Sequence, residues 1–233
     1  MKYDARPKAR QFIKETWQRQ ANLSVFLILL ATSVFVLPVL AGQQRNFNLY
    51  ATVVSTLLLI AGFGMGWGRP KLFFAALVVG TPTLAVRWAY YLHPGHQIEL
   101  WAEILTLLTV LVIGYVLLAQ VFREGPIDEV RVQGAVAAYL LMGVGYAHAY
   151  RIAEYFNPNA ITSTEGRMSS FVDWIYYSFS TLSTLGYGDI IPTGHTSRML
   201  AIGEAISGQL FLAILVARLV AMQVGGPPES SQR

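Results

Sequence analysis

The sequence contains no cysteine and few charged residues. Of its 233 residues, 13% are charged and 54% are hydrophobic, whereas soluble domains average about 25% charged residues. The absence of cysteine excludes disulfides, thiolate metal sites and thiol catalysis. The shortage of charge predicts an all-α integral membrane protein, and the length provides for roughly five to seven spans of 20 residues each.

Six apolar stretches are predicted to cross the membrane as helices. They cover residues 22–41, 49–67, 71–92, 98–122, 131–156 and 197–223. The apolar core of the first stretch is longer than the roughly 7–15 residues of a signal peptide, and no convincing cleavage site follows it. We therefore expect it to be retained as the first span.

The basic residues are distributed unevenly between the two sides of these spans. If the N-terminus is cytoplasmic, 12 of the 17 lysines and arginines lie on the cytoplasmic side. The asymmetry predicts cytoplasmic termini in a multi-pass protein of the plasma membrane, or of the bacterial inner membrane in a prokaryote. The net charge of +4 thus follows from topology, and we expect no nucleic-acid partner.

The fourth predicted span lacks arginine and lysine from Ile104 to Phe122. A voltage sensor needs several charges that move together, because each charge that crosses the field contributes about 2.3 kcal/mol per 100 mV. The sequence therefore predicts a protein that is not strongly voltage-gated.

The segment Ser183–Asp189 reads Ser-Thr-Leu-Gly-Tyr-Gly-Asp, with glycine at alternate positions. A narrow pore that strips water from an ion must offer inward-pointing backbone carbonyls in its place. An ordinary strand alternates its carbonyls, so some residues must leave the usual φ range, and Gly186 and Gly188 can adopt positive φ without steric cost. A short helix is expected just before this segment, with Ser170 as its N-cap and Asp173 as the capping-box partner.

This segment resembles the selectivity filter of potassium channels, with Pro192 three residues beyond Asp189 as in that family. The layout is similar to that of six-span channels with one pore loop per chain, without the arginine-rich helix. The resemblance implies a re-entrant pore helix and filter between the fifth and sixth spans, K+ as permeant ion, no cofactor, and a homotetramer around a central pore. It implies K+ binding at Thr184, Leu185, Gly186, Tyr187 and Gly188, with Asp189 at the outer mouth.

The resemblance also implies residues that support the filter and form the gate. The expected supports are Trp174, Tyr176, Tyr177, Ser180, Thr181 and Glu204. Glu204 is an intramembrane carboxylate, which is costly unless partnered, so it serves either as support, with Ser180 or Thr181 as donor, or in gating. The expected hinge and cavity residues are Gly208, Gln209, Leu212 and Val216.

These elements divide the chain into five parts. Residues 1–20 form a basic segment, either an interfacial helix on anionic lipids or a plain flank. Residues 21–122 form a four-helix membrane domain, and residues 123–130 a linker that either transmits movement or is passive. Residues 131–224 form the pore domain, and 225–233 a short polar tail.

Several polar residues outside the filter have two interpretations. Arg87 either snorkels to the interface or pairs with Glu99 or Glu103. For His148, a packed and hydrogen-bonded side chain is favoured over a proton sensor. His93 and His96 are favoured as loop residues over metal ligands. The glycine-rich run at residues 62–68 is favoured as a site of close helix packing over a dinucleotide-binding motif.

The leading functional prediction is a K+-selective channel. The alternatives are an accessory membrane subunit that conducts only in a hetero-oligomer, or a weakly selective cation channel. An ion-coupled transporter is disfavoured because such proteins usually join four filter-like loops in one chain. No nucleophile, base and orienting group occur together outside the filter loop, so we do not expect an enzyme.

Overall fold

The computed structural model describes residues 20–40, 47–65, 70–123 and 129–224, apart from residues 165, 167 and 169. The first helix, Gln20–Leu40, contains the π-helical stretch η1 (Thr32–Val36) and ends in α2 (Leu37–Leu40). The later helices are α3 (Phe47–Met65), α4 (Pro70–Leu92), α5 (His96–Val121), α6 (Glu129–Phe156), α7 (Phe171–Leu182) and α8 (His195–Val224). Two short strands, β1 (Ile161–Ser163) and β2 (Ile190–Pro192), flank α7.

Each of the six predicted spans coincides with a long helix whose bounds lie close to those expected. Within the described residues, four helical segments are long and apolar enough to cross a membrane, namely Gln20–Leu40, α5, α6 and His195–Arg218 of α8. The chain is therefore an α-helical, multi-pass membrane protein.

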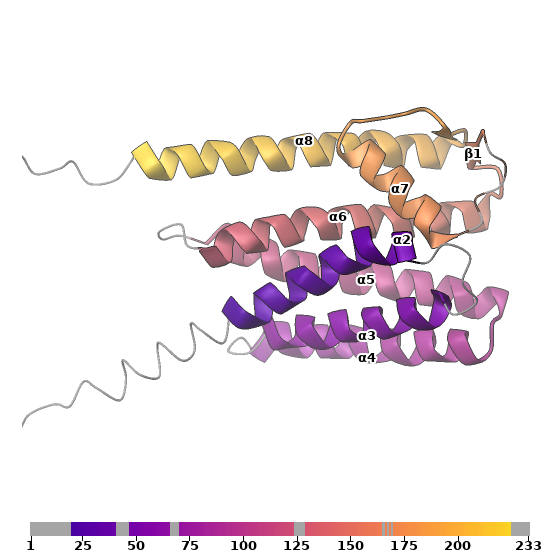
Figure 1. Ribbon diagram of the computed structural model, residues 1–233, viewed down its shortest axis with the longest axis horizontal. Coiled ribbons are helices and arrows are strands. Elements are labelled where there is room, and N and C mark those ends of the chain that lie inside the picture. Colours follow the sequence, from indigo (N-terminus) through magenta and orange to yellow (C-terminus); the bar gives the residue numbers. More distant parts are fainter. Residues whose placement is uncertain are drawn as a thin grey trace, which may run out of the picture.

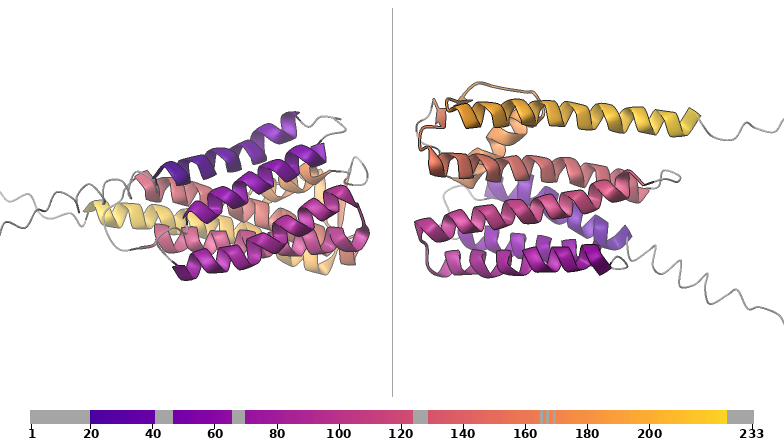
Figure 2. Two further views of the ribbon diagram at one scale, coloured as in Figure 1. Left: turned by 90° about the horizontal axis from the view of Figure 1, so that it is seen from below. Right: turned by 180° about the vertical axis from the view of Figure 1, so that it is seen from behind.

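The long helices run side by side, as Figures 1 and 2 show from three directions. The first and last described residues lie at one end of this bundle, and α7 lies near the other end, between α6 and α8 (Figure 1). We call the end that carries α7 and the two strands the filter end. α7 packs against both α6 and α8, and α5 packs against α6 and α4.

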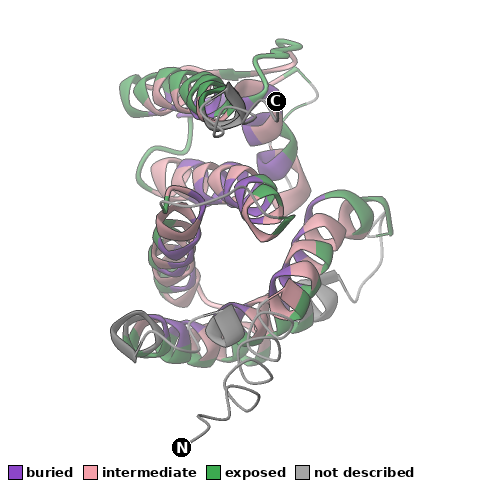
Figure 3. Ribbon diagram, turned by 90° about the vertical axis from the view of Figure 1, so that its left-hand side faces the viewer, coloured by how far each residue is buried: buried purple, intermediate pink, exposed green. Residues whose placement is uncertain are grey.

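A continuous apolar core joins the first helix to α5 and α6. Leu23, Phe26 and Leu30 are buried in one cluster with Ile113 of α5 and Leu141 of α6. Viewed along the helices, buried residues face the neighbouring helices and exposed ones lie on the rim (Figure 3). Burial of this apolar surface inside the chain fixes the early helices against the pore unit of the same chain.

Gly62, the first residue of the glycine-rich run at 62–68, lets α3 pack closely against α5, as the sequence predicts. A β-carbon on Gly62 would lie 3.0 Å from Cδ1 of Ile113 in α5. The rest of that run beyond Met65, the basic segment up to residue 19, linker residues 124–128 and the tail 225–233 lie outside the described residues.

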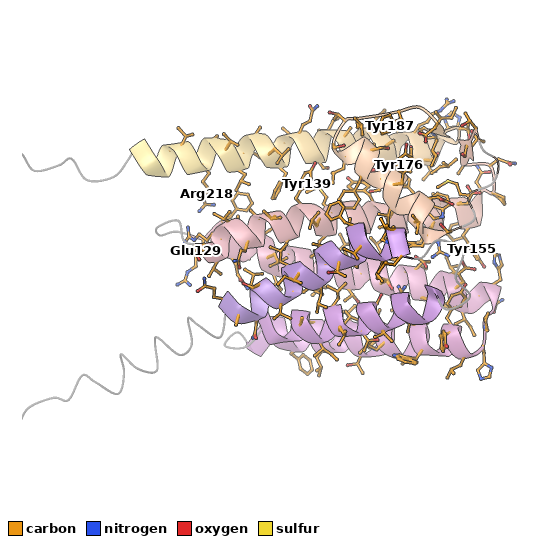
Figure 4. The ribbon with its side chains drawn as sticks, viewed as in Figure 1. Glu129, Tyr139, Tyr155, Tyr176, Tyr187 and Arg218 are labelled. Carbon is orange, nitrogen blue, oxygen red and sulfur yellow. The ribbon has the colours of Figure 1, made fainter. Side chains whose placement is uncertain are left out.

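At the end opposite the filter, Arg218 ties α8 to the last turn of α5 (Figure 4). Its guanidinium donates hydrogen bonds of 2.7 Å to the carbonyls of Phe122 and Arg123. It also lies 5.1 Å from the centre of the Phe122 ring. Arg218 thus satisfies carbonyls that the end of α5 leaves without helical partners.

Candidate functional site: the pore loop

The backbone of the filter segment alternates between positive and negative φ. Thr184, Gly186 and Gly188 have φ of +60°, +55° and +81°, whereas Leu185 and Tyr187 keep negative values. The prediction for Gly186 and Gly188 is confirmed. Thr184 was not predicted, because a non-glycine residue rarely adopts this region. Alternation of this kind lets successive carbonyls turn to the same side of the chain, as an ion-coordinating ladder requires.

The last turn of α7 anchors the beginning of this ladder. The amides of Leu185 and Gly186 donate to the carbonyl of Ser180 at 2.8 and 3.1 Å, and that of Thr184 donates to the carbonyl of Thr181 at 2.9 Å. Ser180 and Thr181 therefore hold the filter through their main chain. Their hydroxyls instead donate to the carbonyl of Tyr177, at 2.9 Å each.

The predicted capping box begins α7. The Ser170 side chain accepts the Asp173 amide, and the Ser170 amide donates to Oδ2 of Asp173 at 3.0 Å. The helix runs from Phe171 to Leu182 and ends at the filter, so that its carbonyl end, with its partial negative charge, points toward the filter base.

One of the three expected aromatic supports reaches the filter tyrosine within the chain. The rings of Tyr176 and Tyr187 stack with centres 6.3 Å apart, and the Tyr176 hydroxyl donates to Oδ2 of Asp189 at 2.8 Å (Figure 4). Trp174 and Tyr177 are buried in a cluster with Tyr150 of α6 instead. Within one chain α7 therefore turns two of the expected supports toward α6, and their role around the filter stays a prediction.

A two-stranded antiparallel sheet closes the outer part of the loop. Ile161 of β1 pairs with Pro192 of β2, and Ser163 pairs with Ile190. The Thr164 amide also donates to the carbonyl of Asp189 at 2.9 Å. The sequence did not predict this sheet, because three-residue strands leave no periodic pattern.

Glu204 is fully buried behind α7 and bridges three helices. The Tyr150 hydroxyl of α6 donates to Oε2 at 2.6 Å, and Oγ of Ser178 lies 2.5 Å from Oε1. The prediction of a pore-helix partner is confirmed, but its identity as Ser180 or Thr181 is wrong. Ser178 takes that place because it lies on the side of α7 that faces α6 and α8.

Ser178 has one hydroxyl proton for two acceptors. Its Oγ also lies 2.7 Å from the carbonyl of Gly143 in α6. If Ser178 donates to that carbonyl, only a proton carried by Glu204 completes the second contact. All the contacts are satisfied together when Glu204 is neutral and donates to Ser178.

Two glycines create the space in which α7 lies. A β-carbon on Gly208 of α8 would lie 2.4 Å from the carbonyl oxygen of Leu182, and one on Gly143 of α6 would lie 2.6 Å from the Phe179 ring. Gly208 is therefore a close-contact glycine at the base of the filter. α8 continues as one helix through it, from His195 to Val224.

The filter and the expected cavity stripe form an exposed face of the chain. Leu185 and Tyr187 are 57% and 67% exposed, and Leu212 and Val216 are 46% and 57% exposed. Gln209 is also exposed. These side chains make no internal core and remain available to a pore or to partner chains.

A buried ionic cluster joins α5 to α6 beside the start of α7. Glu103 accepts hydrogen bonds from His148 and Arg151, and Arg151 also pairs with Glu99. The expectation of a packed, hydrogen-bonded His148 is confirmed. Of the two alternatives for Arg87, the structure shows no ion pair with Glu99 or Glu103: Arg151 holds both carboxylates, while Arg87 donates to Thr106 at 2.8 Å.

His93 lies in the loop, as expected, whereas His96 is the first residue of α5 and stacks on Tyr155 with ring centres 4.3 Å apart. Within the part of the chain that the structure describes, no group of three or more His, Cys, Asp or Glu side chains could hold a metal ion.

Comparisons with known proteins agree with this pore loop. Residues 135–224, which contain most of α6, all of α7, the filter and α8, match a family described as ion channel. The chain is 46% identical to Two-pore potassium channel 4 of Arabidopsis thaliana over 50 residues. This match covers 22% of this chain and 18% of that protein. The chain is 38% identical to the voltage-gated potassium channel Kch of Escherichia coli K12 over 60 residues. This match covers 26% of this chain and 12% of Kch. The matched part of the chain, residues 135–224, is thus similar to ion channels, and its relatives include potassium channels.

A further relative matches a longer stretch of the chain. Protein LctB of Bacillus caldotenax is 37% identical over 87 residues, which are 35% of this chain and 64% of LctB. The chain thus spans less than two thirds of each relative named here. No solved structure gives a match. These matches point to a non-enzymatic ion channel.

Proposed function

We propose that four copies of this chain form a K+-selective channel that conducts K+ passively through their four filter segments. The observation that carries the proposal is the alternating φ at Thr184, Gly186 and Gly188. A run of carbonyls turned to one side imitates the hydration shell of K+. In this assignment K+ binds along Thr184, Leu185, Gly186, Tyr187 and Gly188, and Asp189 lies at the outer mouth.

The tetramer follows from the number of filter segments. Each chain carries one such segment, and a ring of carbonyls around an ion needs several. The exposed face of Leu185, Tyr187, Leu212 and Val216 supports the assignment, because large apolar side chains beside a pore loop are costly unless partners cover them.

The topology proposed with this function has six spans, cytoplasmic termini and the filter end on the outer side. α5 carries no arginine or lysine between residues 104 and 121. We therefore propose a channel that is not strongly voltage-gated and that requires no cofactor.

The test is ion flux through the purified chain in liposomes. We expect K+ and Rb+ to enter vesicles that contain this chain alone, with Na+ excluded. Absence of flux in folded, homogeneous protein would favour the accessory-subunit alternative. Comparable Na+ and K+ flux would favour the weakly selective cation channel.

A further inference from the structure

A small cavity lies between the first four long helices and the pore helix. Its volume is about 110 Å³, and its wall includes residues of the first helix, α3, α4, α5, α6 and α7. Apolar side chains form most of the wall, among them Phe26, Leu30, Leu58 and Ile113. A cavity of this order can hold a small molecule, since an engineered apolar cavity of about 150 Å³ in another protein binds benzene.

Arg87 places one positive charge on this wall. Within the described residues, its guanidinium donates one hydrogen bond, to Thr106, and no carboxylate lies within 4.0 Å of it. A guanidinium has five N–H donors, so several remain for a further acceptor. A charge inside a membrane domain is costly without a partner.

The neighbouring polar groups do not supply that acceptor. Glu103 is engaged by His148 and Arg151, and Glu99 is engaged by Arg151. The threonine hydroxyls of the wall are committed to one another or to backbone carbonyls, as the bonds from Thr83, Thr106 and Thr109 show. Glu103 still attracts the charge of Arg87 from beyond 4.0 Å, but it does not occupy the guanidinium donors, so Arg87 can take a further acceptor from inside the cavity.

We propose that this cavity binds a small organic carboxylate, whose carboxylate group pairs with Arg87 and whose short apolar body fills the space between the helices. A carboxylate matches the planar fork of a guanidinium through two parallel hydrogen bonds. The apolar wall favours a ligand with a few methylene groups over a fully hydrated inorganic anion. The small volume limits the ligand to about the size of butyrate.

Such a ligand would touch the pore helix directly. Phe171, Val172 and Ile175 of α7 line the cavity together with His148. The Phe171 ring is held between the His148 ring, 4.8 Å away, and the Arg151 guanidinium, 5.5 Å away. A ligand in the cavity would therefore contact the first turns of α7, the helix that leads into the filter.

The experiment measures butyrate binding to the detergent-purified full chain at pH 7.5, by calorimetry and by the shift of the thermal unfolding midpoint. 1-Butanol serves as the neutral analogue, inorganic phosphate as the anion without an apolar body, and octanoate as the longer carboxylate. We expect butyrate to bind and to raise the midpoint, with weaker effects from butanol and phosphate. Arg87→Gln should weaken butyrate binding about tenfold or more, since it removes a charge-assisted pair.

Two variants keep the result decisive. Leu58→Trp fills the cavity and leaves Arg87 in place, so it should abolish butyrate binding even if Arg87→Gln fails to fold. Arg123→Gln removes an exposed arginine at the opposite end and should bind butyrate normally. Equal binding by wild type and Arg87→Gln, equal binding of butanol and butyrate, or binding of octanoate alone would overturn the proposal.

Discussion

Positive φ is the residue-level property on which the filter depends. Gly186 and Gly166 both have it, at +55° and +110°, and a β-carbon at either position would meet nothing within 4 Å. Alanine therefore introduces backbone strain of about 1–3 kcal/mol at both positions, without a steric clash at either. Only Gly186 lies in the carbonyl ladder.

We accordingly expect Gly186→Ala to abolish K+ selectivity or conduction and Gly166→Ala to preserve both. The measurement is the ratio of K+ to Na+ flux in liposomes, with each variant checked for intact assembly. A Gly186→Ala channel with the wild-type ratio of K+ to Na+ flux would contradict the filter assignment. Backbone strain at position 186 would then have no effect on selectivity.

Glu204 shows how one buried side chain can hold three helices together. An ionised Glu204 accepts from both Ser178 and Tyr150, whereas a neutral Glu204 can donate to Ser178 and accept from Tyr150, which leaves the Ser178 proton for the carbonyl of Gly143. Glutamine reproduces this pattern, because its amide nitrogen donates and its oxygen accepts. Leucine leaves the buried Tyr150 hydroxyl without this partner, at a cost of about 1–3 kcal/mol, whereas Ser178 keeps the carbonyl of Gly143.

Glu204→Gln should thus remain close to wild type in thermal stability, whereas Glu204→Leu should lower the unfolding midpoint. Tyr150→Phe should lower the midpoint in the wild type, where it removes a donor to Glu204, and raise it in the Glu204→Leu background, where it removes an unpaired hydroxyl. These midpoints can be measured on purified protein by fluorescence-detected size exclusion after heating. A Gln variant as unstable as the Leu variant would show that Glu204 needs its charge.

At the scale of the element, the glycines of α8 can serve one of two purposes: they can let the helix bend, or they can let α7 approach it closely. Alanine at either Gly203 or Gly208 favours the helix by roughly 1 kcal/mol and stiffens it. A β-carbon at Gly203 would meet only the Tyr146 hydroxyl at 3.7 Å, whereas at Gly208 it would overlap the Leu182 carbonyl at 2.4 Å.

If contact is the reason for Gly208, Gly208→Ala should destabilise the protein and impair conduction, and Gly203→Ala should do neither. Thermal stability and liposome flux check the pair. Reduced open probability with unchanged stability in Gly208→Ala would instead support a hinge.

The same elements show which features could be predicted from the sequence. The long helices follow from runs of apolar residues, and the start of α7 follows from the side chains of Ser170 and Asp173, which act within one turn. Partners between helices could not be predicted. Which hydroxyl meets Glu204 depends on the rotation of α7 about its axis, and the pairing of Glu103 with His148 joins positions 45 residues apart.

For the whole molecule, the arginine-free α5 predicts weak dependence on voltage. Among the side chains described in the first four long helices, Arg87 is the only arginine or lysine, and three or four charges per subunit are typical of steep gating. Single-channel recording across voltage should show a far smaller change in open probability. A gating charge of three or more per subunit would contradict this.

The absence of cysteine permits a direct test of the proposed assembly. Val216 and Ile28 are both large, exposed apolar side chains, at 57% and 64%. In the proposed tetramer, Val216 lies near the central axis and Ile28 on the early helix lies away from it. Val216→Cys should therefore form disulfide-linked dimers on oxidation, detected on non-reducing gels, and Ile28→Cys should not. Equal cross-linking of both would contradict the tetrameric arrangement.

The pairing of β1 with β2 has a consequence for the order of biosynthetic events. The two strands close residues 164–189 into a loop that contains α7 and the filter. Closing a loop of this length costs little more entropy than closing a shorter one, and both strands of the pair belong to the same chain. Each newly made chain can thus fold its own pore hairpin before it meets a partner, so that oligomerisation joins preformed quarters of the pore.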